Sequence, residues 1–391
     1  MKPHIPVEEF HNRVSKAQAM MKQQNIDILF AYGNETEPQY QKYFSNFWPA
    51  FETAAVIFAQ EGAPLLLVGP ESQKRASELQ IIEDVRSIAA FRESSSPEYN
   101  GIHLDSFYEI INQLTGGSRP EHVAIAGSRL LPFDIYKELK ENLEKYGEVQ
   151  IHADTIVDTL RTYKSKNEIA CIQRACNITA KTMYYLLDNI RPGMTELQVK
   201  GLALGKMFEL GAEGEAFPIW VLSGRGIDYA IGRARQKTIQ PGELVQLQIG
   251  ARYEGYASTI ARPIIIGQPE QWMKDSINAL YDGYNAVLSK LSAEDHAEAA
   301  AIHFSHTMKR NGYYNQTLYG PCHGLGTVEC EAPWIEEGSD FLLSKGMIFG
   351  MDLYIENHKK QYGMRVEDTI CITEEEPLNM TNFPRELYIL S

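Results

Sequence analysis

The chain has 391 residues, of which 44% are hydrophobic and 23% charged, and its formal net charge is -14. These values are typical of a globular protein that is long enough for two domains. The acidic balance, without a dense run of Lys and Arg, argues against a nucleic-acid-binding surface. No window approaches the ~20 apolar residues of a membrane span, and no signal-like segment opens the chain. We therefore expect a cytoplasmic protein without nucleic-acid or membrane partners.

The first part of the chain alternates between helical and strand patterns. An amphipathic helical pattern over 7–23 leads into an apolar run of strand length at 26–32. Two alternating segments, 53–58 and 64–68, are joined by a short turn and predict a hairpin. This alternation predicts a mixed α/β domain over residues 1–158. Further helices are expected at 71–79, 104–114 and 134–145, and further strands at 85–89 and 123–126.

The second part of the chain opens with an S-x-x-E capping pattern. Ser165 and Glu168 precede a long helical pattern that runs to about residue 188. Thr195 is a candidate N-cap for a second helix to residue 210. The patterns predict helices packed on a curved antiparallel sheet, an α+β domain over residues 159–391. Strands are expected at 217–222, 244–252, 256–266, 347–355 and 365–373, and helices at 270–291 and 293–311.

Three segments in this second part resemble, in order, the site motifs of the creatinase/aminopeptidase P/prolidase family, whose catalytic domain has the pita-bread fold. They are Gln-Ile-Gly-Ala-Arg-Tyr-Glu-Gly-Tyr-Ala-Ser-Thr at 248–259, Pro-Cys-His-Gly-Leu-Gly at 321–326 and Met-Arg-Val-Glu-Asp-Thr at 364–369. The resemblance implies an α+β protein with an N-terminal creatinase/prolidase-like domain over 1–158 and a pita-bread domain over 159–391. It also implies a homodimer that acts on a small molecule or a short peptide.

The metal ligands of the family are only partly present. In the family's peptidases, two aspartates that help to hold two divalent ions stand at the positions of Gln248 and Thr259. His323 matches the imidazole ligand and Glu367 the bridging glutamate, while Asp352 stands where a glutamate would. Two dications close together need several anionic ligands, so we expect no dinuclear site and no required metal cofactor. A single divalent ion at His323, Asp352 and Glu367 is an alternative.

Other positions near the implied site have changed as well. Ile231 and Cys330 stand where many members of the family have histidines that move protons or orient the substrate. An isoleucine cannot transfer a proton, and a thiol needs a neighbouring cation to become a reactive thiolate. Arg262 ends the altered strand pair and could meet a substrate carboxylate or an acidic neighbour. The expected substrate-binding residues are Gln248, Thr259, Arg262, Ile231 and Cys330.

The residues that remain lead to three functional hypotheses. Without metal, Asp352 and Glu367 would share a proton or pair with a cation, and His323 would be a proton carrier near neutral pH. The leading hypothesis is a creatinase-like, metal-independent hydrolase of a C–N bond in a small nitrogenous metabolite or short peptide, with His323, Glu367 and Asp352 as catalytic residues. One alternative is an Xaa-Pro aminopeptidase or dipeptidase with a reduced metal site. Another is a non-catalytic binding protein of the same fold.

Overall fold

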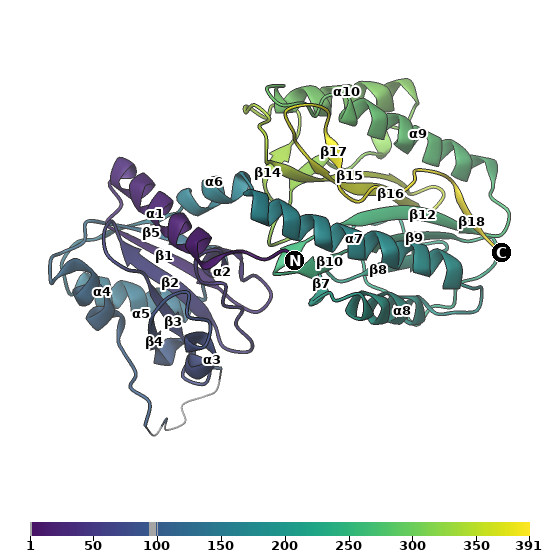
Figure 1. Ribbon diagram of the computed structural model, residues 1–391. Coiled ribbons are helices and arrows are strands. Elements are labelled where there is room, and N and C mark those ends of the chain that lie inside the picture. Colours follow the sequence, from purple (N-terminus) through teal and green to yellow (C-terminus); the bar gives the residue numbers. More distant parts are fainter. Residues whose placement is uncertain (1, 94–98, 100) are drawn as a thin grey trace. The chain divides into compact units, whose positions relative to one another are not determined.

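The structure is a computed structural model that describes residues 2–93, 99 and 101–391 (Figure 1). It divides into two compact units, of which the smaller is Ile5–Arg161 and the larger is Thr162–Ser391 with the residues before Ile5. The boundary between the units falls in helix α6 (Ile156–Thr162), where the expected domain boundary after residue 158 also lies. Every helix in the described part of the chain is too short or too polar to span a lipid bilayer.

The smaller unit is built on a mixed sheet, which has six strands among the described residues in the order β4-β3-β2-β1-β5-β6. Strand β1 is antiparallel to β2 and parallel to β5. All residues of β1 are buried, which explains its continuous apolar run, because a central strand is covered on both faces. The strands are β1 (Ile28–Gly33), β2 (Ala54–Ala59), β3 (Leu65–Val68), β4 (Asp84–Ser87), β5 (His122–Ala126) and β6 (Gln150–Ala153).

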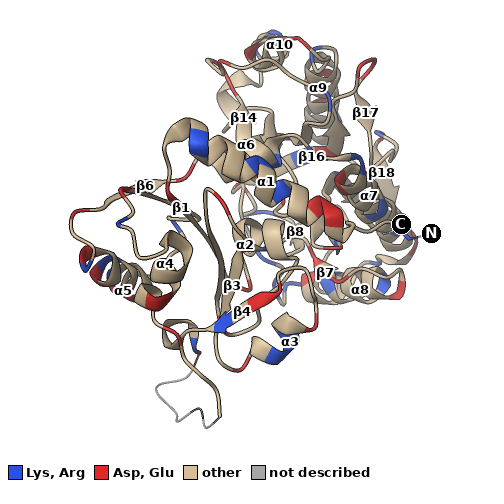
Figure 2. Cartoon of the chain, turned by 60° about the vertical axis from the view of Figure 1, so that its left-hand side comes forward, with Lys and Arg blue, Asp and Glu red and all other residues tan. Residues whose placement is uncertain are grey.

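Helices α4 and α5 pack on this sheet through apolar side chains such as Ile110 and Leu139. The exposed side of α5 carries charges of both signs (Figure 2), including an i,i+4 ion pair between Lys137 and Glu141 at 3.8 Å. Such pairs are typical of a helix with one solvated face. The helices of this unit are α1 (Val7–Gln24), α2 (Gln39–Ser45), α3 (Gln73–Ser77), η1 (Ala89–Phe91), α4 (Phe107–Thr115) and α5 (Phe133–Glu144).

The larger unit contains an extended, mainly antiparallel sheet with the strand order β14-β13-β15-β16-β12-β9-β8. Strands β17 and β18 pair with β16 and β12, and β7, β10 and β11 form a smaller sheet. The strands are β7 (Gly214–Glu215), β8 (Trp220–Ser223), β9 (Leu244–Ile249), β10 (Ala251–Tyr253), β11 (Tyr256–Ala257), β12 (Ile260–Ile266), β13 (Cys322–Gly324), β14 (Glu331–Ile335), β15 (Ile348–Asn357), β16 (Tyr362–Cys371), β17 (Leu378–Asn379) and β18 (Tyr388–Leu390).

Capping boxes start the first two helices of this unit, as the sequence predicts. The Ser165 hydroxyl accepts from the Glu168 backbone N–H at 3.1 Å, and the Glu168 carboxylate accepts from the Ser165 N–H at 2.9 Å. Thr195 and Gln198 repeat the arrangement. The helices are α7 (Lys166–Asn189), α8 (Glu196–Glu209), α9 (Gln271–Leu288), α10 (Ala297–Arg310) and η2 (Tyr314–Gln316).

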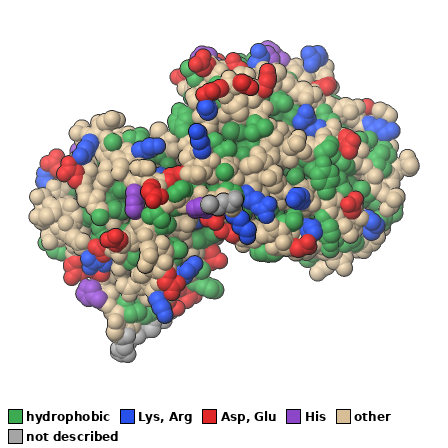
Figure 3. All heavy atoms as spheres, viewed as in Figure 1, with side chains coloured by type: hydrophobic (Ala, Val, Ile, Leu, Met, Phe, Trp, Pro, Cys, Tyr) green, Lys and Arg blue, Asp and Glu red, His purple; other side chains and the backbone are tan. Residues whose placement is uncertain are grey.

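One face of the larger sheet packs on α9 and α10 and forms the main core of the unit. Leu353 of β15 and Val366 of β16 belong to the same buried cluster as Leu280 of α9 and Phe304 of α10. Figure 3 shows that the outer surface of the unit in this view mixes hydrophobic and charged side chains. Because side chains alternate between the two faces of a strand, every second residue of β15 and β16 points away from this core.

Candidate active site

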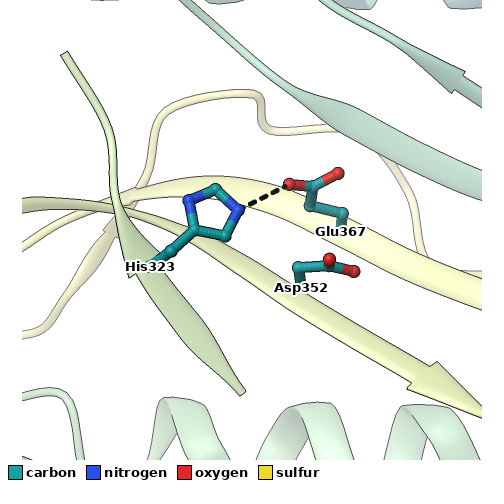
Figure 4. A group of neighbouring side chains, drawn as sticks. All are labelled: His323, Asp352 and Glu367. Atoms are coloured by element: carbon teal, nitrogen blue, oxygen red, sulfur yellow. Dashed lines mark ion pairs between the residues drawn. The ribbon is translucent and has the colours of Figure 1, made fainter. Parts of the chain in front are cut away.

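The register of two strands brings the two expected carboxylates together. Strands β15 and β16 are antiparallel, and Asp352 is directly opposite Glu367. Their neighbours Leu353 and Val366 face the core under α9 and α10, so Asp352 and Glu367 both point to the other face of the sheet. Figure 4 shows the imidazole of His323 facing the carboxylate of Glu367, with Asp352 beside them.

His323 comes from the short strand β13, where it pairs with Gly350 of β15. A side chain at Gly350 would overlap the imidazole ring and would approach Glu367 Oε1 at 3.2 Å. Because Gly350 has no side chain, there is room at this position for the imidazole ring of His323. His323 Nδ1 lies 3.0 Å from the carbonyl oxygen of Gly324. Because a carbonyl oxygen only accepts, Nδ1 carries a proton and Nε2 faces the carboxylates.

His323, Asp352 and Glu367 form a compact group of possible metal ligands. One donor atom from each of the three lies within 4.8 Å of the others. His323 Nε2 is 3.6 Å from Glu367 Oε1, which is beyond hydrogen-bond length. Glu367 is fully buried, and no described residue donates a hydrogen bond to its Oε1 atom. The buried oxygen and the ring nitrogen thus face each other across a gap.

Gln248 and Arg365 occupy the other sides of the two carboxylates. The amide nitrogen of Gln248 donates to Glu367 Oε2 at 2.6 Å, and its amide oxygen accepts from Arg365 Nη1. Arg365 Nε is 2.8 Å from Asp352 Oδ1. The Tyr319 hydroxyl donates to Asp352 Oδ2 at 2.8 Å and accepts from Arg365 Nη2 at 2.5 Å. The guanidinium of Arg365 therefore compensates the negative charge of Asp352.

Sequence reasoning does not identify Arg365, Tyr319 or Glu329 as site residues. A signal for Arg365 exists, because residues two apart in a strand share a face and Arg365 is two residues before Glu367. The ring of Trp220 packs against the guanidinium of Arg365, with the ring centroid 4.6 Å from the guanidinium carbon. No pattern in the sequence marks Tyr319 or Glu329.

Burial and mutual charge shift the acidity of the site. Burial raises the pKa of Asp352 to about 6, although Arg365 opposes the shift. Burial also raises the pKa of Glu329 to about 8. Against the effect of burial, His323 and Arg365 hold the pKa of Glu367 below its usual value. For His323, burial opposes protonation, but Glu329 and its other neighbours outweigh it and hold the pKa well above the usual value. Positive charge is therefore concentrated on the imidazole and the guanidinium, and Glu329 retains its proton more readily than an ordinary glutamate.

His323 and Asp352 of this group line a cavity of about 340 Å³. Much of the wall is apolar or aromatic, which is typical of a small-molecule site. Ile231 lines it and is 81% exposed. Cys330 also lines it, and its thiol adds to the raised pKa of His323. The lining residues are Phe217, Trp220, Ile231, Gln248, Tyr319, Gly320, Cys322, His323, Glu329, Cys330, Trp334, Ile335, Glu336, Asp352 and Arg365.

Two of the expected substrate-binding residues lie inside the protein. Thr259 is buried and contributes to the lowered pKa of Glu367. Arg262 is 0% exposed and its Nη2 atom lies 2.9 and 3.0 Å from the two oxygens of Asp368. The guanidinium of Arg262 therefore forms an ion pair with Asp368 inside the protein. The position of Arg262 gives no support to an encounter with a substrate carboxylate.

Models of two known protein families match the two parts of the chain. The model of metallopeptidase family M24 matches residues 170–374, more than half of the chain, and the model of the Creatinase/Prolidase N-terminal domain matches residues 13–163. The chain belongs to metallopeptidase family M24. The expected α+β fold, with an N-terminal creatinase-like domain and a C-terminal pita-bread domain, is confirmed.

Individual relatives match this chain over 60% to nearly all of its length. An Xaa-Pro dipeptidase of Pyrococcus furiosus is 26% identical over 379 residues, which are 96% of this chain and 99% of the relative. An uncharacterized peptidase of Bacillus subtilis, YqhT, is 31% identical over 60% of this chain and 66% of its own length. The solved Xaa-Pro dipeptidase from Bacillus anthracis has a TM-score of 0.82 at 23% identity and covers 97% of this chain and 100% of its own. At that identity, the likeness to the solved structure supports the fold alone.

The residues of this M24 site fit one divalent ion and not two. With ligand bonds of about 2.0–2.2 Å, neighbouring ligands of one ion lie about 3–3.5 Å apart. The gap of 3.6 Å between His323 Nε2 and Glu367 Oε1 is close to this range, and Asp352 adds a third donor within 4.8 Å of both. Among the described residues, His323, Asp352 and Glu367 are the group of possible ligands found, and a second ion has no comparable set there. Gln248 and Thr259 are uncharged, and the oxygen of Gln248 already accepts from Arg365.

Proposed function

We propose that the chain is a peptidase that hydrolyses Xaa-Pro bonds with one divalent ion held by His323, Asp352 and Glu367. Relatives named Xaa-Pro dipeptidase support this substrate class. They favour the expected alternative over the leading hypothesis of a metal-independent, creatinase-like hydrolase. Metal independence receives no support from them. The homodimer and the cytoplasmic location implied by the sequence stay predictions.

One observation carries the proposal. Three possible metal ligands come from three different strands, and two of them, His323 and Asp352, line a cavity whose other walls are mainly apolar. Phe217, Trp220 and Trp334 provide aromatic surface for an apolar ring such as that of proline. A metal group and an apolar wall in one cavity suit the cleavage of a peptide bond next to such a residue.

A divalent ion, when bound, would polarise the scissile carbonyl group and acidify a water molecule. The protein's own contribution is to hold the ligands in place. Gln248 fixes one oxygen of Glu367, and Tyr319 fixes one oxygen of Asp352. Such partners restrict the rotation of the ligating carboxylates. Arg365 connects both partners, since it donates to Gln248 and to Tyr319.

The space provided by Gly350 gives a direct test of the ligand geometry. Gly350→Ala is expected to weaken Mn²⁺ binding at least about tenfold, because the added methyl group displaces the imidazole from its place beside Glu367. Isothermal titration of ion-free protein measures the effect. Gly201→Ala is the control, because nothing lies within 4 Å of a methyl group there. Equal Mn²⁺ affinity of the Gly350→Ala and unaltered proteins would show that the imidazole is not a ligand.

Hydrolysis assays test the proposed activity. The protein is freed of metal with a chelator, supplied with Mn²⁺ or Co²⁺, and assayed on an Xaa-Pro dipeptide and on the matching Xaa-Ala dipeptide. We expect hydrolysis of the Xaa-Pro peptide to require the added ion and to exceed that of the Xaa-Ala peptide. Folded protein that hydrolyses neither peptide with any ion would refute the proposal. Turnover of an amidino compound such as creatine by ion-free protein would instead support the metal-independent hypothesis.

A further inference from the structure

We propose that Glu329 belongs to the metal site and supplies a third carboxylate to the divalent ion, beside Asp352 and Glu367. This inference rests on the proposed function, because it concerns the same ion. Gln248 and Thr259 are uncharged, so the site lacks two carboxylates. In this proposal the loop residue Glu329 replaces part of that missing negative charge.

The position of Glu329 is the first support. It lies in the loop between β13 and β14, and its side chain is only 16% exposed. Glu329 Oε1 is 3.5 Å from His323 Nε2, the same nitrogen that faces Glu367 Oε1 at 3.6 Å. One ring nitrogen thus faces two carboxylates at nearly equal distances, and it can donate at most one proton to the pair.

The lack of a second cation is the next support. Among the described residues, Glu329 forms an ion pair with His323. Arg365, the basic residue beside His323 on the cavity wall, is already engaged by Asp352, Gln248 and Tyr319. A carboxylate that is largely withdrawn from water is costly unless it pairs with a cation. Among the described residues, Glu329 therefore has only the shared imidazole as a cationic partner, and a bound divalent ion would provide a second one.

The charge of the site agrees with one dication only when Glu329 is counted. With His323 neutral, as a metal ligand must be, the carboxylates of Asp352, Glu367 and Glu329 outnumber the guanidinium of Arg365 by two. A single divalent ion neutralises that excess. Without Glu329, the ion would leave the buried site with a surplus positive charge.

Glu329 stands next to the compact ligand group and not inside it. His323, Asp352 and Glu367 form the group whose donor atoms all lie within 4.8 Å of one another. A rotation of the Glu329 side chain toward Glu367 therefore accompanies ion binding in this proposal. The position of Glu329 in a loop, and not in a strand, makes such a rotation compatible with the sheet.

Mn²⁺ titration of variants tests the role of Glu329. Glu329→Gln is expected to weaken Mn²⁺ binding at least about tenfold, and Glu329→Asp is expected to keep part of the affinity. Glu336→Gln is the matched control, because Glu336 lines the same cavity but is exposed. That variant loses the same charge and is expected to change the affinity less than about twofold. Unchanged Mn²⁺ affinity in Glu329→Gln would overturn the inference.

The visible absorption of bound Co²⁺ separates ligation from a structural role. A carboxylate that binds the ion shapes its coordination, so Glu329→Gln should alter the position or intensity of the Co²⁺ bands. A variant with an unchanged Co²⁺ spectrum and a lower melting temperature would show that Glu329 only stabilises its loop. If the unaltered protein binds neither ion, the proposed function itself fails. If it binds one ion and Glu329→Gln binds it equally well, only the role of Glu329 fails.

Discussion

His323→Ala is expected to abolish Xaa-Pro hydrolysis and to weaken Mn²⁺ binding by more than about a hundredfold. The expected loss exceeds the 10- to 100-fold typical of residues that only orient a ligand, because the variant removes a ligand itself. The imidazole is the one nitrogen donor in a group that otherwise offers carboxylates. Hydrolysis rates and Mn²⁺ titration of the same preparation measure both effects.

The fold should tolerate the loss of this ring. His323 lies at the cavity wall, so its removal enlarges an existing space and leaves no sealed void. Thermal unfolding of His323→Ala is therefore expected to stay close to that of the unaltered protein. His303→Ala is the control, because His303 is exposed on α10 and is not among the residues that line the cavity. Turnover that persists at its full rate in His323→Ala would refute both the metal site and the catalytic role of the residue.

Arg262→Met is expected to destabilise the larger unit by about 3–5 kcal/mol, because it leaves the buried carboxylate of Asp368 without its cation. Both side chains are 0% exposed. The guanidinium also donates to the carbonyl oxygens of Glu367 and Phe383, at 2.8 and 3.0 Å. Its loss would therefore disturb the strand that carries Glu367. Calorimetry detects the effect as a lower unfolding temperature.

Arg225→Met serves as the control for this substitution, because Arg225 is exposed. Replacing both partners by apolar residues, as in Arg262→Met with Asp368→Leu, should recover part of the loss, since the double variant leaves no unpaired buried charge. An unfolding temperature of Arg262→Met equal to that of the unaltered protein would show that the pair does not stabilise the fold.

The main elements of the fold could be predicted from local patterns. The capping boxes at Ser165 and Thr195 fix two helix starts, and the site motifs indicate the order of the catalytic strands. The strand of His323 could not be predicted in this way, because β13 is three residues long and is defined by its partners β14 and β15. Strand patterns need more residues than that to become visible.

The site could be predicted only in part, for a similar reason. Asp352 and Glu367 converge through the register of two long strands, which the motifs imply. Arg262 is in β12, in which all residues are buried. Polar and apolar residues therefore do not alternate along this strand, and the sequence does not show toward which face of the sheet the guanidinium points. Glu329 lies in a loop between strands, and its approach to His323 depends on how β13 and β14 pair.

Arg365 changes the interpretation of the lost aspartates. Sequence reasoning proposed that a substrate cation would pair with Asp352 and Glu367. In the structure, the guanidinium of Arg365 already lies 2.8 Å from Asp352 and binds the amide oxygen of Gln248. The two other carboxyl groups, those of Glu329 and Glu367, both face Nε2 of His323, at 3.5 and 3.6 Å. This arrangement is consistent with the proposal of one ion at the site.

The metal content of the purified protein tests the central claim most directly. Elemental analysis after saturation with Mn²⁺ and removal of free ion is expected to find one Mn²⁺ per chain, and none in His323→Ala. Two ions per chain would contradict the account, and so would Xaa-Pro hydrolysis that continues undiminished in protein shown to contain no metal.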